Sequence, residues 1–329
     1  MNQLSIGKLR GLQQLAGERG VLTICAIDHR GALKRALNEK DPDAVSYQDM
    51  VDFKLDLCRA MAPLASAVLL DPVYGVAQAI NASVLSRRLG LLVSLEKTGY
   101  AGSDFARITE LLPGWSVKKV KKLGASACKI LVYFRPDSKD TASRQTELIA
   151  GLAEECRNED IPFLVEPVCY PLAGEKPGEF AYRKPELIIE TARQFTALPI
   201  DILKSEFPAD IDYEKDESKL LGYCRDLDRA SRLPWVLLSA GASFDVFYRQ
   251  AEIAFRGGAS GFLAGRALWQ EAVKINTRAG RWEFFKTTAA ERFMKLTKLA
   301  EDLAVPWYVK MGAADGKFGS VSEGWYKTY

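Results

Sequence analysis

Three charged side chains lie inside short apolar runs, where ionised groups are costly to bury. They are Lys204 in "DILKSEFP", Lys129 in "ACKILVYF" and Glu166 in "PFLVEPV". A neutral amine attacks a ketone, so a nucleophilic lysine needs its pKa lowered from about 10.4 by desolvation or a neighbouring cation. A carboxylate within reach moves protons onto and off the adduct. These residue types predict imine chemistry, with Lys204 as the nucleophile, Glu166 as the proton-transfer group and Lys129 as the neighbouring amine.

Each of these residues, taken alone, has a simpler explanation. A lysine in a strand often carries its ammonium to water or to a salt bridge. Glu206 lies two residues after Lys204, so it would face the same side of a strand and would neutralise the lysine. For His29, the only histidine, a hydrogen bond to backbone is simpler than a role as a base. The catalytic interpretation therefore depends on these side chains converging at one place in the fold.

Eight short apolar runs rich in β-forming residues recur along the chain, with helix-like stretches between them. The runs span 21–28, 66–71, 91–96, 127–134, 162–168, 201–207, 235–241 and 261–265, and the clearest helices are expected at 46–62, 143–159, 184–195 and 243–258. This alternation predicts a parallel α/β fold, a single closed (β/α)₈ barrel of the TIM type. An open doubly wound sheet is the rival, and it is disfavoured because the first run ends in "IDHRGAL" rather than a glycine-rich nucleotide loop. The barrel is expected to occupy residues 1–311, followed by a C-terminal extension or arm at 312–329.

Polar residues gather where the predicted strands end, which is the face of a barrel that carries chemistry. Lys129 and Lys204 belong to the fourth and sixth runs, and alternate strands contribute side chains to a common layer, so both amines are expected to enter one cavity. Small residues follow the last two strands in "LLSAGAS" and "GASGFLAGRALW", a common place for a phosphate, with Arg266 available to pair with it. In the alternative, Gly241 and Gly265 only turn the chain and Arg266 pairs with an acidic loop.

The bulk composition narrows the class of protein. The 329 residues carry 45 Lys and Arg against 42 Asp and Glu, a balance too even for a nucleic-acid-binding surface. No apolar run is long enough to span a membrane, and the first residues lack the apolar core of a signal peptide, so a cytoplasmic protein without nucleic-acid or membrane partners is expected. Six scattered cysteines are expected to be reduced thiols. One histidine makes a zinc site of the usual kind improbable, and we expect neither a metal nor a cofactor.

Several of these segments together resemble one family, the class I tagatose-1,6-bisphosphate aldolases of the DeoC/LacD type. The resemblance runs in order through "AIDHRGALKRAL", "SAVLLDPVYG", "LEKTGY", "WSVKKVKKLGASACKILVYF", "ECRNEDIPFLVEP", "DILKSEFP", "LPWVLLSAGAS" and "GASGFLAGRALW". It implies a TIM barrel, an imine at Lys204, proton transfer by Glu166 and a neighbouring amine at Lys129. It also implies a substrate-binding set, which comprises Asp28 for the sugar hydroxyls, His29, and Ser239, Gly241, Gly265 and Arg266 for the phosphate.

The resemblance implies cleavage of a phosphorylated ketohexose, most simply tagatose 1,6-bisphosphate, to dihydroxyacetone phosphate and glyceraldehyde 3-phosphate. The chain departs from the family pattern at His29, where a glutamine is expected, and "VEPVCYP" is closer to sulfofructose-phosphate aldolases. A 6-deoxy-6-sulfofructose-1-phosphate aldolase is therefore the alternative enzyme, and a non-catalytic sugar-phosphate-binding regulator is the alternative of another class. A homo-oligomer is left open, since the aromatic tail at 312–329 suits a subunit surface.

Overall fold

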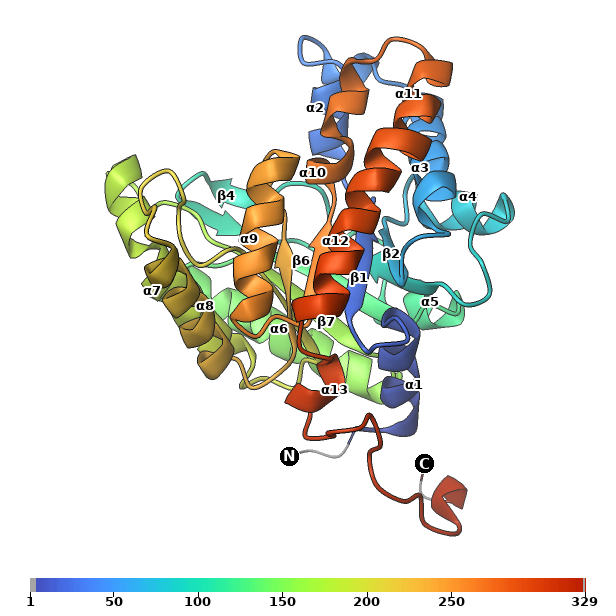
Figure 1. Cartoon of the computed structure of the whole chain (residues 1–329), viewed down its shortest axis with the longest axis vertical. Helices are drawn as coiled ribbons and strands as arrows, with labels where there is room; N and C mark the ends of the chain where they lie inside the picture. Colours follow the sequence, from blue (N-terminus) through green and yellow to red (C-terminus); the bar gives the residue numbers. More distant parts are fainter. Residues whose placement is uncertain (1–3, 328) are drawn as a thin grey trace.

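Eight parallel strands close into a barrel in the computed structural model, which describes residues 4–327 and 329. The strand order around the barrel is β1-β10-β9-β8-β7-β6-β3-β2, and Figure 1 labels β1, β2, β6 and β7 among these strands. The strands are β1 Leu22–Ala26, β2 Ala67–Leu70, β3 Gly90–Ser94, β6 Ala127–Tyr133, β7 Phe163–Val168, β8 Ile202–Ser205, β9 Trp235–Leu238 and β10 Gly261–Ala264. The predicted (β/α)₈ barrel is confirmed, and every predicted strand is present.

Most strands are shorter than the apolar runs that predicted them. The run at 201–207 yields a strand of four residues, Ile202–Ser205, and the run at 21–28 yields Leu22–Ala26. The polar residues at the ends of these runs, such as Asp28 and Glu206, lie beyond the hydrogen-bonded ladder. These ends therefore belong to the loops at the barrel mouth rather than to the sheet.

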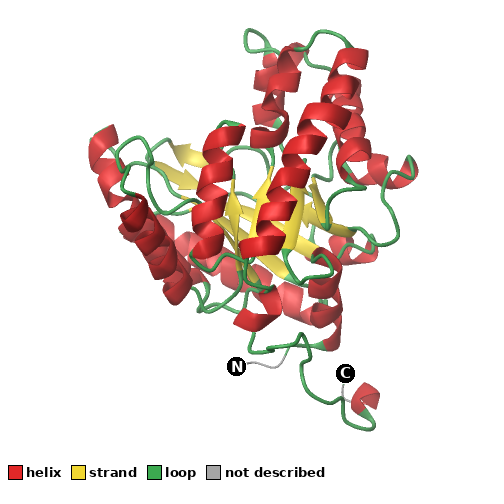
Figure 2. Ribbon diagram, in the orientation of Figure 1, coloured by secondary structure: helices red, strands yellow, loops and turns green. Residues whose placement is uncertain are grey.

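Helices cover the outside of the barrel (Figure 2). The longer ones are α1 Ile6–Leu15, α3 Tyr47–Met61, α6 Lys139–Asn158, α7 Pro177–Phe195, α8 Glu217–Ala230, α9 Phe244–Arg256 and α12 Ala290–Leu303. The shorter ones are α2 Gly31–Leu37, α4 Val76–Asn81, α5 Val117–Lys122, α10 Arg266–Trp269, α11 Arg278–Phe284 and α13 Trp307–Lys310, with single turns η1 Pro42–Ala44, η2 Gln270–Lys274, η3 Phe285–Ala289 and η4 Trp325–Lys327.

A capping motif defines the start of α3, whereas α7 starts earlier than the sequence predicted. Ser46 and Asp49 form a reciprocal capping box at the start of α3, where the sequence predicts the helix. Helix α7 begins at Pro177, although the sequence predicted a start near 184. Pro185 lies inside the helix rather than in its first turn, where proline is ordinarily placed.

Two apolar layers result from the alternation of side chains along each strand. Alternate residues such as Leu22, Ile24, Leu164 and Ile202 fill the barrel interior, and their neighbours pack outward against the helices. Leu12 and Leu15 of α1 and Trp307 of α13 belong to the interior cluster and close one end of the barrel. Polar side chains line the other end of the barrel, where the strands end.

A two-stranded antiparallel hairpin, which the sequence did not predict, lies apart from the barrel strands (Figure 2). It consists of β4 Ala101–Ser103 and β5 Ala106–Ile108. The backbone N–H of Tyr133, the last residue of β6, donates to Oγ1 of Thr109 at 3.0 Å, so the hairpin is attached where β6 ends.

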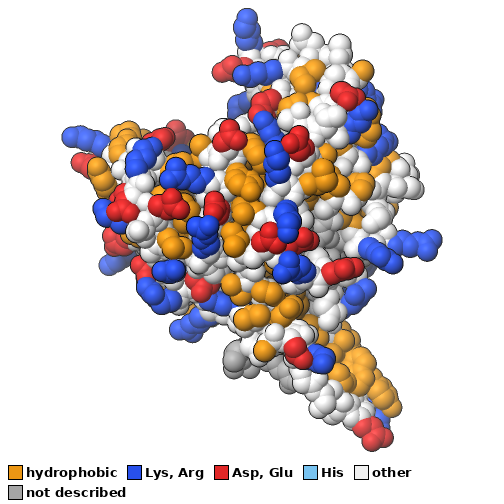
Figure 3. Space-filling model, viewed as in Figure 1, with side chains coloured by type: hydrophobic (Ala, Val, Ile, Leu, Met, Phe, Trp, Pro, Cys, Tyr) orange, Lys and Arg blue, Asp and Glu red, His pale blue; other side chains and the backbone are white. Residues whose placement is uncertain are grey.

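The C-terminal segment leaves the barrel at the end closed by α1 (Figure 1). Phe318 stacks on Trp307 with ring centroids 5.4 Å apart, and the Tyr329 hydroxyl bonds Asp160. Hydrophobic side chains gather on this projection (Figure 3), where Val321, Tyr326 and Tyr329 are exposed. The division at residue 311 and a role for the segment between subunits stay predictions.

Candidate active site

Lys204 is buried at the end of β8 and points into the barrel. It lies two residues after Ile202, an interior residue, so strand alternation directs it to the same side. Its Nζ lies 2.6 Å from Oε1 of Glu166, and only 4% of the residue is exposed. The same alternation applies to Glu166 after Leu164 and to Lys129 after Ala127. The predicted convergence of these three side chains is therefore present in the structure.

The hypothesis that Glu206 neutralises Lys204 is wrong. Strand β8 ends at Ser205, so alternation no longer fixes the direction of the next side chain. Glu206 instead lies 3.3 Å from Nζ of Lys184 and accepts a hydrogen bond from the backbone N–H of Cys169. The only carboxylate paired with Lys204 among the described residues is that of Glu166.

Three carboxylates surround the ammonium group of Lys129. Its Nζ lies 2.9 Å from Oδ2 of Asp28, 2.8 Å from Oε1 of Glu96 and 2.8 Å from Oε2 of Glu166. Glu166 thus places one oxygen on each lysine. The two amines are therefore held on the two sides of a single carboxylate.

The charged groups of this cluster shift one another's pKa values. Burial alone would lower the pKa of Lys129, but Asp28, Glu166 and Glu96 reverse that effect and raise it well above its ordinary value. Burial alone would raise the pKa of Glu166 and of Asp28, yet Lys129 and, more weakly, Lys204 lower both. The raised pKa of Lys129 favours its charged form and the lowered pKa of Glu166 favours its ionised form, and the other oxygen of Glu166 lies 2.6 Å from Nζ of Lys204.

Glu96 completes this cluster, although it lay outside the predicted site. Its Oε1 also lies 3.8 Å from the Arg30 guanidinium, while its Oε2 is buried with no hydrogen-bond partner. Glu96 is the last residue of the apolar run 91–96 and lies two residues beyond Ser94, where β3 ends. In the sequence, Glu96 was only one of several polar residues at the ends of the predicted strands.

His29 lies between the lysine cluster and the small residues after β10. Its ring makes an edge contact with Trp269 at 5.2 Å between centroids, and its Cε1 lies against Gly265. Its Nδ1 has no hydrogen-bond partner among the described residues and lies 3.7 Å from Oδ1 of Asp28. Burial lowers the pKa of His29 to about 4, with Arg266 and Lys204 adding to the effect and Asp28 opposing it.

The low pKa of His29 predicts a loss of stability on mild acidification. The unfolded chain binds a proton at His29 near pH 6.5, whereas the folded chain does so only near pH 4, so unfolding is favoured as pH falls between these values. Urea denaturation of the wild type, compared with His29→Gln, is expected to show about 2 kcal/mol of extra loss in unfolding free energy between pH 7 and pH 4.5. Parallel stability curves for the two proteins would contradict this prediction.

Arg266, Gly241, Ser239 and Gly265 form a second group beside His29. Gly241 has φ +81°, and a Cβ on it would lie 2.8 Å from Cζ of Arg266, so the guanidinium packs directly on the bare backbone. The backbone N–H of Gly265 points at Oγ of Ser239 at 3.4 Å. Arg266 forms no ion pair with any carboxylate in the described part of the chain, so the alternative of a salt bridge to an acidic loop is wrong.

Within residues 4–327 and 329, no three His, Cys, Asp or Glu side chains are grouped so as to hold a metal ion. No helix in this part of the chain is long and apolar enough to cross a membrane. All six cysteines are free.

Comparison with known proteins places this site in a family. The model of the DeoC/LacD family aldolases matches residues 22–271, which include all eight barrel strands. This chain belongs to the DeoC/LacD aldolase family. The resemblance seen in the sequence is thereby confirmed.

Curated DeoC/LacD relatives match almost the whole chain. The tagatose 1,6-diphosphate aldolase 1 of Enterococcus faecalis is 33% identical over 331 residues, covering 94% of this chain and 100% of that protein. The tagatose 1,6-diphosphate aldolase of Listeria monocytogenes is 33% identical over 335 residues, covering 95% and 97%. A solved structure described as a Schiff-base-forming fructose-1,6-bisphosphate aldolase has a TM-score of 0.56 at 19% identity, covering 85% of this chain and 98% of that one, and shares the fold.

All of the residues predicted for the site lie at the barrel mouth of this DeoC/LacD aldolase. Lys204, Glu166, Lys129 and Asp28 form one connected cluster of ion pairs. His29 joins that cluster to Ser239, Gly241, Gly265 and Arg266. The roles of the individual residues stay predictions.

Proposed function

We propose that this aldolase is a metal-independent class I enzyme that cleaves tagatose 1,6-bisphosphate to dihydroxyacetone phosphate and glyceraldehyde 3-phosphate through an imine on Lys204. The observation that carries the proposal is the buried Lys204 ammonium 2.6 Å from Oε1 of Glu166, with the Lys129 cation on the other oxygen of that carboxylate. The names of the curated relatives support tagatose bisphosphate as the substrate.

The geometry accounts for the first half of the reaction. Glu166 takes a proton from Lys204, and the neutral amine adds to the C2 ketone to give a carbinolamine. Glu166 returns a proton to the departing hydroxyl, and loss of water leaves the protonated imine. Lys129 is the nearby positive charge that lowers the pKa of Glu166 and so keeps this carboxylate ionised before it accepts a proton.

The second half breaks the bond between C3 and C4. Glu166 accepts the proton of the C4 hydroxyl, the C3–C4 electron pair moves into the imine to form an enamine, and the aldehyde leaves. Protonation of C3 and hydrolysis of the imine then release dihydroxyacetone phosphate. In this proposal Asp28 binds a sugar hydroxyl, and Arg266 binds the phosphate next to the ketone over the bare backbone at Gly241; the packing of the guanidinium on Gly241 supports the second role.

Borohydride trapping tests this proposal. Sodium borohydride reduces an imine to a stable amine, so protein treated with borohydride and tagatose 1,6-bisphosphate is expected to gain the mass of the reduced ketose phosphate on the tryptic peptide that contains Lys204. Protein treated with borohydride alone provides the control. An unaltered Lys204 peptide in protein that turns over substrate would contradict the imine mechanism.

The same experiment separates the alternatives. Parallel trapping and turnover with 6-deoxy-6-sulfofructose 1-phosphate decide between a distal phosphate and a distal sulfonate. A kcat below about 10⁻³ s⁻¹ on both ketoses with binding intact would instead indicate a regulator, because enzymes ordinarily work at about 1–10³ s⁻¹.

A further inference from the structure

A second arginine at the barrel mouth has no carboxylate partner. Arg107 lies on β5 of the hairpin, and within the described residues it forms no ion pair, as is also true of Arg266. The other cations nearby are neutralised, since Lys129 contacts three carboxylates and Lys204 contacts Glu166. Arg107 and Arg266 are therefore two arginines at the mouth that form no ion pair with a carboxylate in the described part of the chain.

The two arginines lie on opposite sides of the mouth. Arg266 directly follows β10, and the hairpin that carries Arg107 is attached where β6 ends. In the strand order β10-β9-β8-β7-β6, the strand β6 is four places from β10 in a ring of eight. Lys204, on β8, lies between them.

Three tyrosine rings contact the guanidinium of Arg107, and its terminal nitrogens form no hydrogen bond with them. Its Cζ lies 4.7 Å from the ring centroid of Tyr100, 5.4 Å from that of Tyr170 and 5.5 Å from that of Tyr133. Its Nε donates to the carbonyl oxygen of Asp104 at 2.9 Å. Neither terminal nitrogen donates to a described residue, so the planar fork remains free for a bidentate anion.

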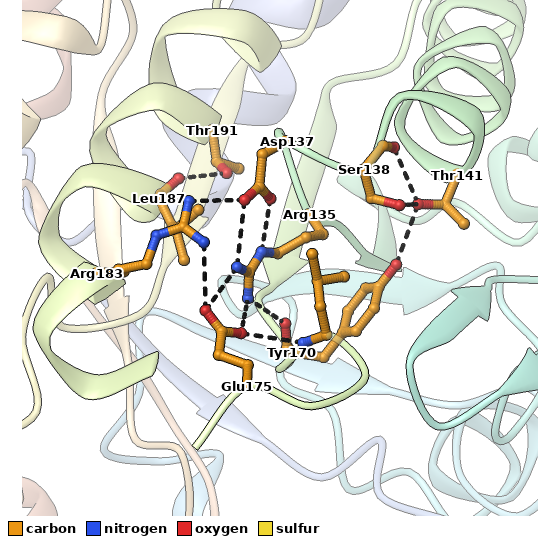
Figure 4. Close-up of polar contacts among 10 residues, drawn as sticks. Arg135, Asp137, Ser138, Thr141, Tyr170, Glu175, Arg183, Leu187 and Thr191 are labelled. Carbon is orange, nitrogen blue, oxygen red and sulfur yellow. Dashed lines mark hydrogen bonds and ion pairs between the residues drawn. The ribbon is translucent and has the colours of Figure 1, made fainter. Parts of the chain in front are cut away.

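The rings of Tyr100, Tyr133 and Tyr170 form a cage around Arg107, and the polar network drawn in Figure 4 fixes Tyr170. The fully buried Arg135 donates to the Tyr170 carbonyl oxygen at 2.9 Å and pairs with Glu175, while the Tyr170 hydroxyl shares a 3.2 Å hydrogen bond with Thr141. Tyr170 is held at both ends. Its ring is therefore a rigid support for Arg107.

The wall of this cage at Tyr133 joins the hairpin to the lysine cluster. Nε2 of Gln145 on α6 donates to the carbonyl oxygens of Tyr133 at 3.1 Å and of Arg107 at 3.4 Å. Tyr133 is in the same alternating series as Lys129 on β6, so its ring stands above the lysine on the inner side of the barrel. Arg107 is thus placed at the mouth, one ring away from the lysine cluster.

We propose that Arg107 binds the anionic group at the distal end of the substrate while Arg266 binds the phosphate next to the ketone. The inference rests on the proposed function, because it assigns the two ends of that substrate. A planar guanidinium pairs with the oxygens of a phosphate or of a sulfonate, so the distal group belongs to this class of tetrahedral oxyanions. A ketose with anions at both ends would span the mouth across Lys204.

The test compares substrates with and without the distal anion. Arg107→Leu is expected to lower kcat/KM for tagatose 1,6-bisphosphate about 10- to 100-fold, chiefly through KM, because a charge-assisted bidentate contact is lost. Turnover of tagatose 1-phosphate, which lacks the distal anion, is expected to change by less than about threefold, and this also shows that the variant folds. Arg107→Lys keeps the charge but loses the fork, so it is expected to lose about 10-fold.

Lys97→Leu is the matched control, because this cation next to Glu96 is already paired with Glu110 at 3.1 Å. It is expected to change neither substrate by more than about threefold. Running 6-deoxy-6-sulfofructose 1-phosphate alongside identifies the distal group, since a loss confined to that ketose supports a sulfonate at Arg107.

The remaining outcomes distinguish a wrong role for Arg107 from a wrong proposed function. Equal losses of Arg107→Leu on tagatose 1,6-bisphosphate and tagatose 1-phosphate, or no loss on any of the three ketoses, would overturn the role of Arg107 and leave the proposed function intact. Wild-type protein that cleaves none of the three ketoses would overturn both.

Discussion

Lys204→Met is expected to lower kcat by about 10⁴-fold or more, the scale seen when a covalent nucleophile is removed. Methionine has nearly the length of lysine but no amine, so no imine forms and the electrons of the C3–C4 bond have no acceptor. Burial of the apolar side chain next to Ile202 is tolerated, and Glu166 keeps Lys129 as a counter-ion. The measurement is kcat by a coupled assay, with borohydride trapping on the same samples and thermal unfolding to confirm the fold.

Glu166→Gln is the informative contrast to Lys204→Met. Glutamine retains the shape of the side chain but does not accept a proton, so turnover is expected to fall by about 10²- to 10⁴-fold while some trapped imine persists on Lys204. Lys204→Met should show no trapped adduct at all. Trapping that survives in Lys204→Met would place the imine on another amine and would refute the assignment.

Lys129→Met is expected to lower the free energy of unfolding by about 3–5 kcal/mol near neutral pH and to abolish most turnover. Asp28, Glu96 and Glu166 would remain around an apolar side chain with their shared cation removed. Breaking a buried ion pair on one side costs more than the pair contributes, because the remaining charges are left desolvated. Urea denaturation measures the change, and Lys97→Met, at an exposed pair, should cost less than about 1 kcal/mol.

The loss of stability expected for Lys129→Met depends on pH in a way that identifies its electrostatic cause. In the wild type, Lys129 lowers the pKa of Asp28 and Glu166, so their contribution is present above the pKa of the unfolded chain and is lost only in acid. Without Lys129, burial dominates and raises these pKa values, so the folded variant binds more protons than the unfolded chain. Its deficit in stability is therefore expected to shrink as pH falls from 8 towards 5, and a deficit independent of pH would contradict the electrostatic cause.

Much of the mouth was predictable because strand alternation is a local property. Lys129, Glu166 and Lys204 each follow an interior residue by two positions in a run of apolar residues, and that spacing alone directs them inward. The parallel alternation of strands and helices predicted the barrel, and the barrel predicted that the strand ends meet. The small residues after the last two strands, and then the family resemblance, predicted phosphate binding by Ser239, Gly241, Gly265 and Arg266.

The sequence by itself determined the barrel, its eight strands and the inward direction of Lys129, Glu166 and Lys204, because periodicity and strand direction are encoded in short segments. Only the tertiary structure decided the partners: Glu206 turns to Lys184 because β8 ends at Ser205, and Lys129 acquires three carboxylates from separate strand ends. The hairpin that carries Arg107 was likewise settled by its docking on β6 and α6 rather than by its own short, polar sequence. Contacts between distant segments depend on where each strand stops, and no local pattern records that.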